Sequence, residues 1–212
     1  MRRSLTLLLL PLILASCAGV PRLEPLPAGG KDASPARCAA PFLAKGWRLV
    51  HSVSGSFPGG GTTMIGVTEA RPGTRRLHCV LMSVEGLVLC DALYDGKLTV
   101  MRGIGPFSSP DMVMGMVRDI SLMLFAPVGE AETGTVAGAR TCRYRSGEDV
   151  TDISPGMGGT IDLALYAAGT RSRTVRFSRL RGDGLPARME LAAQGVPGYS
   201  LLLDLIEAEP AP

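Results

Sequence analysis

The sequence predicts an α+β fold in which a strongly curved antiparallel sheet of about ten strands packs helices against its concave face. Two runs of short segments with a period of two, over residues 47–102 and 140–206, predict the strands. A segment with a helical period, residues 110–125, stands between them. The chain also holds 27 glycines and 16 prolines, which suit a protein of strands and turns better than a helical bundle.

The first run is predicted to be a meander of five strands. From Trp47 to Phe57 the residues alternate between an apolar face, which includes His51, and a face of Arg, Val and Ser. Asp95 and Gly96 form a strong hairpin signal. The remaining strands of this run are expected at residues 62–70, 75–82, 87–94 and 97–102.

The helix is expected to begin at Pro110, after Ser109 as the capping residue, and to end before Pro127. One of its faces is apolar and the other, which includes Arg118 and Asp119, is polar. The second run of strands is expected at residues 140–145, 160–167, 173–180, 187–193 and 199–206, followed by a frayed tail at residues 208–212.

The N-terminus has the pattern of an export signal. Arg2 and Arg3 precede the apolar residues 5–15, which are too few to span a bilayer of about 30 Å. Leu14-Ala15-Ser16-Cys17 then resembles the bacterial lipobox. That resemblance implies a signal peptide over residues 1–16 and a Cys17 that carries covalent diacylglycerol and an N-acyl chain. No cofactor is expected.

Two or more acyl chains anchor a protein firmly, so the membrane is an expected partner. Ala18 and Gly19 follow the cysteine, where aspartate would imply retention in the inner membrane, so the resemblance implies the periplasmic face of the outer membrane. Residues 17–33 are rich in proline and glycine and are predicted to be a flexible tether. Residues 34–207 form the predicted domain, beginning with a short helix that ends at Phe42.

Composition argues against several functions. Without residues 1–16 the chain has 196 residues (212 − 16), and its net charge falls from +3 to +1 with the loss of two arginines. With only 5% aromatic residues, the protein is not expected to bind nucleic acid. The two histidines, His51 and His78, stand far apart without a metal motif, and no catalytic or phosphate-binding motif is present. We therefore expect no metal and no enzymatic activity.

Four cysteines remain besides Cys17. Cys79 and Cys90 flank the turn at residues 83–86 symmetrically, so a tight hairpin would place them opposite each other, within reach of a disulfide. Cys38 and Cys142 would then form the second pair. Four buried free thiols are the alternative.

The order of elements resembles that of the LolA/LolB family of periplasmic lipoprotein carriers and outer-membrane receptors. The resemblance covers residues 35–207 and is carried by Gly55-Ser56-Phe57, the hairpin at residues 81–89, the helix at residues 110–125 and the segment 186–191. It implies a half-barrel of eleven strands that is capped by helices and holds acyl chains. The receptor's hairpin tip carries a leucine that faces the membrane, whereas this chain has Val84 and Glu85 there, and a carboxylate opposes insertion into hydrocarbon.

These observations give two functional hypotheses. In the first, a non-enzymatic outer-membrane lipoprotein binds acyl chains, of lipoproteins or of lipids, in an apolar cavity beneath the helix. The candidate lid residues are Met112, Met116, Ile120, Met123 and Leu124, since methionine suits adaptable apolar surfaces. In the second, the same residues are ordinary core, and the protein is a structural or interaction subunit of an envelope assembly.

Overall fold

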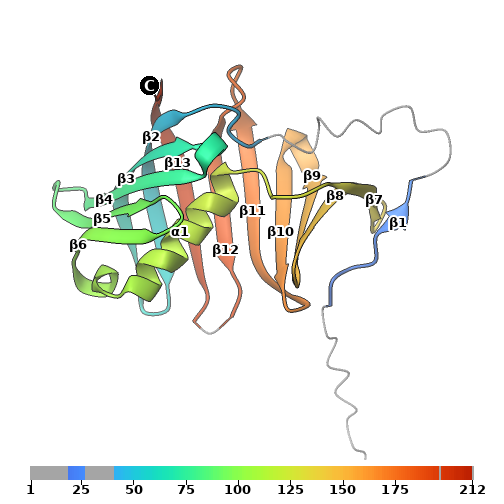
Figure 1. Ribbon diagram of the computed structural model, residues 1–212, viewed down its shortest axis with the longest axis horizontal. Helices are drawn as coiled ribbons and strands as arrows, with labels where there is room; N and C mark the ends of the chain where they lie inside the picture. The colour runs from blue at the N-terminus through green and yellow to red at the C-terminus, as the bar shows by residue number, and fades with distance from the viewer. Residues whose placement is uncertain (1–18, 27–40, 196, 212) are drawn as a thin grey trace, which may run out of the picture.

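The computed structural model describes residues 19–26, 41–195 and 197–211. The predicted signal peptide, Cys17, Cys38 and most of the predicted helix at residues 34–42 lie outside the described residues. Among the described residues, no helix has the length and hydrophobicity needed to cross a bilayer. The described chain forms one antiparallel sheet of thirteen strands and one α-helix, which lies across the sheet (Figure 1).

The strands follow one another in the sheet almost as they do in the chain. The order is β1-β7-β8-β9-β10-β11-β12-β13-β2-β3-β4-β5-β6. The bounds are β1 Glu24–Pro25, β2 Trp47–Phe57, β3 Gly60–Arg71, β4 Arg76–Ser83, β5 Val88–Tyr94, β6 Leu98–Gly103, β7 Glu132–Val136, β8 Ala139–Ser146, β9 Asp149–Pro155, β10 Ile161–Ala167, β11 Thr170–Leu180, β12 Pro186–Ala193 and β13 Tyr199–Pro210. The last strand pairs with β2, so the two meanders join into one continuous open sheet.

The prediction of about ten strands was too low. Strands β7, of five residues, and β9, of seven, were not recognised in the sequence. Strand β1 lies in the predicted tether, where Glu24 and Pro25 pair with β7 at the edge of the sheet. The prediction of a frayed tail was also wrong over residues 208–210, because these residues extend β13 and Pro210 pairs with Trp47.

Helix α1 (Pro110–Leu124) begins and ends close to the predicted positions. Pro110 occupies the first helical turn and suits it, because the backbone N–H that proline lacks has no helical partner there. Ser109 is the N-cap residue but makes no side-chain capping hydrogen bond. The helix buries Val113, Val117, Met123 and Leu124 as the apolar period predicts, but also Asp119, which was expected on the polar face.

The two faces of the sheet differ sharply. The helix face, which α1 covers, carries large buried side chains from the central strands: Val53, Leu163, Val175, Phe177, Met189, Leu191 and Leu203. The opposite face, here called the open face, carries the residues between them. Helices were predicted on the concave face of the sheet, and a hollow of about 860 Å³ lies on the face opposite the helix.

Candidate functional site

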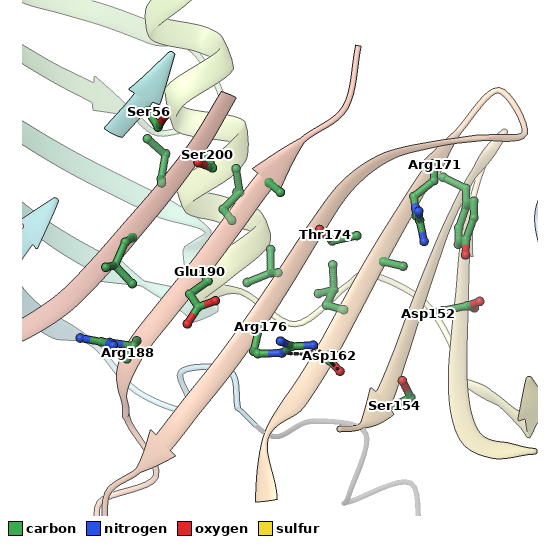
Figure 2. Close-up of a pocket in the computed structure, with 18 of the residues that line it drawn as sticks. Ser56, Asp152, Ser154, Asp162, Arg171, Thr174, Arg176, Arg188, Glu190 and Ser200 are labelled. Carbon is green, nitrogen blue, oxygen red and sulfur yellow. Dashed lines mark hydrogen bonds and ion pairs between the residues drawn. The ribbon is translucent and has the colours of Figure 1, made fainter. Parts of the chain in front are cut away.

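A trough of about 860 Å³ crosses the open face from β8 and β9 to β2. Figure 2 shows it with the strands running beneath the side chains. Its volume falls within the range of small-molecule sites. The lining combines hydroxyl, charged and small apolar side chains, among them Ser54, Ser56, Asp152, Ser154, Asp162, Ala164, Tyr166, Arg171, Thr174, Arg176, Arg188, Glu190, Ala192, Ser200 and Leu202.

The floor of the trough is a row of small residues at matching positions of five strands. Ala164 of β10 lies opposite Thr174 of β11, which lies opposite Ala192 of β12. Ala192 in turn lies opposite Ser200 of β13, which lies opposite Ser56 of β2. Because successive side chains of a strand point to opposite faces, this register places all five on the open face. Five small side chains in line leave a hollow where longer ones would fill it.

Charged side chains form one wall of the trough and neutralise each other. Arg176 donates two hydrogen bonds to Asp162 across β11 and β10, at 2.8 and 3.4 Å. Arg188 donates two to Asp204 across β12 and β13, at 2.7 and 2.9 Å, and this contact lowers the pKa of Asp204. Glu190 lies directly opposite Arg176. Figure 2 shows the dashed contact between Arg176 and Asp162 at the middle of the wall.

A buried ion pair lies at the β8–β9 end of the trough. Arg143 binds both carboxylate oxygens of Asp152, with two N–O distances of 2.7 Å. Only 2% of the Arg143 side chain and 9% of the Asp152 side chain are exposed to solvent. The two charges cancel, so this pair contributes polar surface without net charge.

The predicted cavity beneath α1 is filled by side chains. Met123 and Leu124 are buried, Met116 and Ile120 are partly buried against the core, and Met112 is exposed. A cavity lined by Leu124 and by residues of β2, β12 and β13 has a volume of only about 10 Å³. In this closed arrangement the five predicted lid residues do not enclose space for an acyl chain.

One polar cluster ties α1 to the sheet. Arg173 of β11 binds Asp119 of α1 with an N–O distance of 2.9 Å, and the Tyr199 hydroxyl of β13 donates a hydrogen bond to the same carboxylate. Burial, followed by the contact with Asp119, raises the pKa of Tyr199 to about 12, so the hydroxyl keeps its proton at neutral pH. No local sequence pattern signals this cluster, because its members are far apart in the chain.

The β4–β5 hairpin has the predicted tip. Val84 and Leu87 are exposed there, and Glu85 is fully exposed with a pKa lowered by hydrogen bonding to Ser83. Contact of Val84 and Glu85 with a membrane stays a prediction.

The predicted opposition of Cys79 and Cys90 is wrong. Cys79 lies opposite Ala92, and Cys90 lies opposite Leu81. The turn pairs Ser83 with Leu87 instead of Gly86, and a register shift between Leu81 and Met82 displaces the strands by one more residue. Both are buried free thiols, and burial raises the pKa of Cys79 to about 12. Cys142 is disulfide-bonded, and its predicted partner, Cys38, lies outside the described residues.

The histidines offer no metal site within the described part of the chain, which contains no cluster of three metal-binding side chains. His51 lies on the helix face as predicted, and burial lowers its pKa to about 4. His78 is partly buried and contacts Asp91 at 2.9 Å.

Comparisons with known proteins give only distant likenesses. No family model and no curated protein matches the chain. A LolA superfamily protein from Nitrosomonas europaea aligns over 81% of this chain and 88% of its own, with 9% identity and a TM-score of 0.48. A putative outer-membrane lipoprotein-sorting domain from Vibrio parahaemolyticus (78% and 85%, 9% identity, TM-score 0.42) and a DUF1329 family protein from Desulfovibrio piger (78% and 85%, 12% identity, TM-score 0.38) also align. At these similarities, neither a family nor a ligand follows for this chain.

Proposed function

We propose that this protein is a non-enzymatic lipid-binding protein of the bacterial envelope, anchored to the outer membrane through Cys17, and that acyl chains bind in the trough of the open face. The observation that carries the proposal is the difference in cavity volume between the two faces of the sheet. The trough holds about 860 Å³, whereas the cavity beside Leu124 on the helix face holds about 10 Å³.

The length of the floor suits one acyl chain. Four strand spacings of about 4.8 Å separate Ala164 on β10 from Ser56 on β2, which gives a floor of roughly 19 Å. One leaflet of a bilayer is about 15 Å of hydrocarbon, so the floor could accommodate an extended chain of that length. Each buried methylene would contribute about 0.8 kcal/mol.

The two ends of the trough differ in charge. The charged residues Asp152 and Arg171 lie at its β9–β11 side, whereas its β13–β2 side is lined by the uncharged residues Ser54, Ser56, Ser200 and Leu202. Beyond β2, Ile65 and Met82 lie opposite each other on the open face and are only partly buried. A ligand with a polar head and an apolar tail fits this difference in one direction.

The charges of the trough support binding rather than catalysis. Three arginines each donate hydrogen bonds to both oxygens of one carboxylate. The pairs are Arg143 with Asp152, Arg176 with Asp162 and Arg188 with Asp204. A general acid or base must lie within hydrogen-bond reach of the proton that it transfers, whereas both oxygens of each of these carboxylates are already hydrogen-bonded to an arginine.

A second candidate places the acyl chain beneath α1. The observation that favours it is the cluster of Asp119, Arg173 and Tyr199, which joins the helix to the sheet and could release it as a lid. Binding there requires displacement of the helix, since the closed face is filled.

Native mass spectrometry of a form beginning at Ala18, expressed in the periplasm, tests the proposal. We expect bound lipid or fatty acid in the wild-type protein and none in Ala192→Leu, which fills the floor from the open face. The matched control is Met116→Lys on the helix, which should keep the lipid if the protein remains folded by circular dichroism.

The opposite pattern, with lipid lost only in Met116→Lys, would assign the ligand to the helix face. A clean mass without uptake of added lipid would contradict both sites and favour an interaction subunit of an envelope assembly.

A further inference from the structure

A β-bulge turns one arginine onto the open face at the polar end of the trough. On β11, Arg173 lies opposite Leu165, but the next position of β10, Tyr166, lies opposite Arg171. Ser172 is the extra residue. Without it, Arg171 would share the helix face with Arg173 by strict alternation. With it, Arg171 lines the trough together with Tyr166, and bulges commonly re-aim side chains at binding sites in this way.

The charge of Arg171 is not balanced by a carboxylate. Its guanidinium hydrogen-bonds the neutral side-chain amide of Gln194 and forms no salt bridge within the described residues. The other charges of the trough are matched, since Arg143 pairs with Asp152, Arg176 pairs with Asp162, and Arg188 pairs with Asp204. Glu190, the remaining acid, lies opposite Arg176 in the wall. Figure 2 shows Arg171 at the β9–β11 side, away from the paired wall.

Tyr166 adds a hydrogen-bond donor beside this charge. Only 7% of the residue is exposed, and its hydroxyl has no hydrogen-bond partner in the described part of the chain. Every fully enclosed polar side-chain atom of the described residues does have a partner, so this hydroxyl reaches the open space of the trough. Burial raises the pKa of Tyr166, so the hydroxyl remains protonated at neutral pH and can donate.

We propose that Arg171 and the Tyr166 hydroxyl form an anion subsite that binds the carboxylate or phosphate headgroup of the ligand whose acyl chain lies along the floor. The inference rests on the proposed function, because it assigns the head of a ligand whose tail occupies the trough. A guanidinium and a phenol both donate to carboxylate and phosphate oxygens. The carboxylate of Asp152 also acts on Tyr166, but Arg143 binds both of its oxygens. The small residues Ala164 and Thr174 begin the floor directly beside the subsite.

Titration calorimetry with three amphiphiles of equal chain length tests the subsite. Dodecanoate and dodecyl phosphate, below their micelle concentrations, and dodecanol, below its solubility limit, are titrated into the form beginning at Ala18. We expect at least one of the anions to bind about 10- to 100-fold more tightly than dodecanol, since a hydrogen bond to a charged group contributes this much. The preferred anion distinguishes a fatty acid from a phosphate headgroup.

The variants assign the effect to residues. Arg171→Gln should remove the preference for the anion and leave dodecanol binding unchanged. Tyr166→Phe should reduce the affinity for the anion about 3- to 10-fold. Arg145→Gln, which removes an exposed arginine of β8 outside the trough, is the matched control and should change nothing.

The two proposals fail in different ways. If all three amphiphiles bind equally and Arg171→Gln has no effect, the anion subsite is wrong and the acyl site stands. If none of the three binds to the folded wild-type protein, the proposed function is wrong, and the subsite is wrong with it.

Discussion

The two faces of the central strands are built from the same segments of chain, yet one is a packed core and the other is hollow. Leu163 and Val175 are buried on the helix face, while their neighbours Ala164 and Thr174 form the floor of the trough. The difference is one of size more than polarity, because alanine leaves space that leucine fills. A single strand can therefore hold the fold together with every second residue and bind a ligand with the others.

The largest effect is expected at the β8–β9 end of the trough, where the residues of the open face are buried like those of the helix face. Arg143→Met should cost about 3 to 5 kcal/mol of unfolding free energy, because it leaves the Asp152 carboxylate buried without its partner. Urea denaturation measures the loss. The double variant Arg143→Met, Asp152→Leu should recover most of it, since both charges are then gone. A single variant as stable as the wild-type protein would show that water reaches Asp152 freely.

Adjacent residues of β12 sharpen the comparison between the faces. Leu191→Ala should cost about 2 to 5 kcal/mol, because Leu191 is only 1% exposed and its removal leaves a cavity in the core. Ala192→Leu should change the unfolding free energy little, since the added side chain enters the trough. Thermal or urea unfolding of both variants checks the contrast. Equal losses would mean that the open face is as tightly packed as the helix face.

His51 should make the helix face sensitive to acid. Its pKa is about 4 in the folded protein, because burial disfavours the charged ring, against an ordinary value of 6.5. His51 therefore binds a proton below pH 6.5 in the unfolded chain, but only below about pH 4 in the folded protein. Stability should be constant above pH 6.5 and fall by about 3 kcal/mol as the pH drops to 4.

Urea midpoints at pH 7 and pH 4.5 measure this fall. The variant His51→Leu should lose less stability between the two values, because the carboxylates titrate in both proteins and only the histidine differs. Identical losses in the two proteins would show that His51 is already solvated in the folded state.

The helix face could be predicted from the sequence to a large extent. Alternation placed β2 at residues 47–57 and His51 on its buried face, and the helical period placed α1 within one residue of its observed end. These patterns are local, because side-chain direction follows from position in a strand or helix. Asp119 was misplaced for the opposite reason: its partners Arg173 and Tyr199 come from distant strands, and no local pattern records them.

The trough could not be predicted, although part of its signal was present. The alternation that buries Met189 and Leu191 of β12 assigns Ala192 to the opposite face, but only the strand register aligns Ala192 with Thr174 and Ser200. The bulge at Ser172 is equally invisible, since strict alternation assigns Arg171 to the wrong face. Register shifts also misled the cysteine pairing, because the symmetry of Cys79 and Cys90 about the turn assumed a regular hairpin.

The smallest predicted effect compares two ion pairs of the same chemistry on the open face. Arg176 binds Asp162 with nearly the geometry that Arg143 uses for Asp152, but 53% of the Arg176 side chain is exposed. Water and salt screen an exposed pair, so Arg176→Met should cost no more than about 1 kcal/mol. Urea denaturation at low and high salt measures it, and the difference should shrink as the salt concentration rises. A loss as large as that of Arg143→Met would mean that the wall is desolvated, and therefore that something covers the trough in solution.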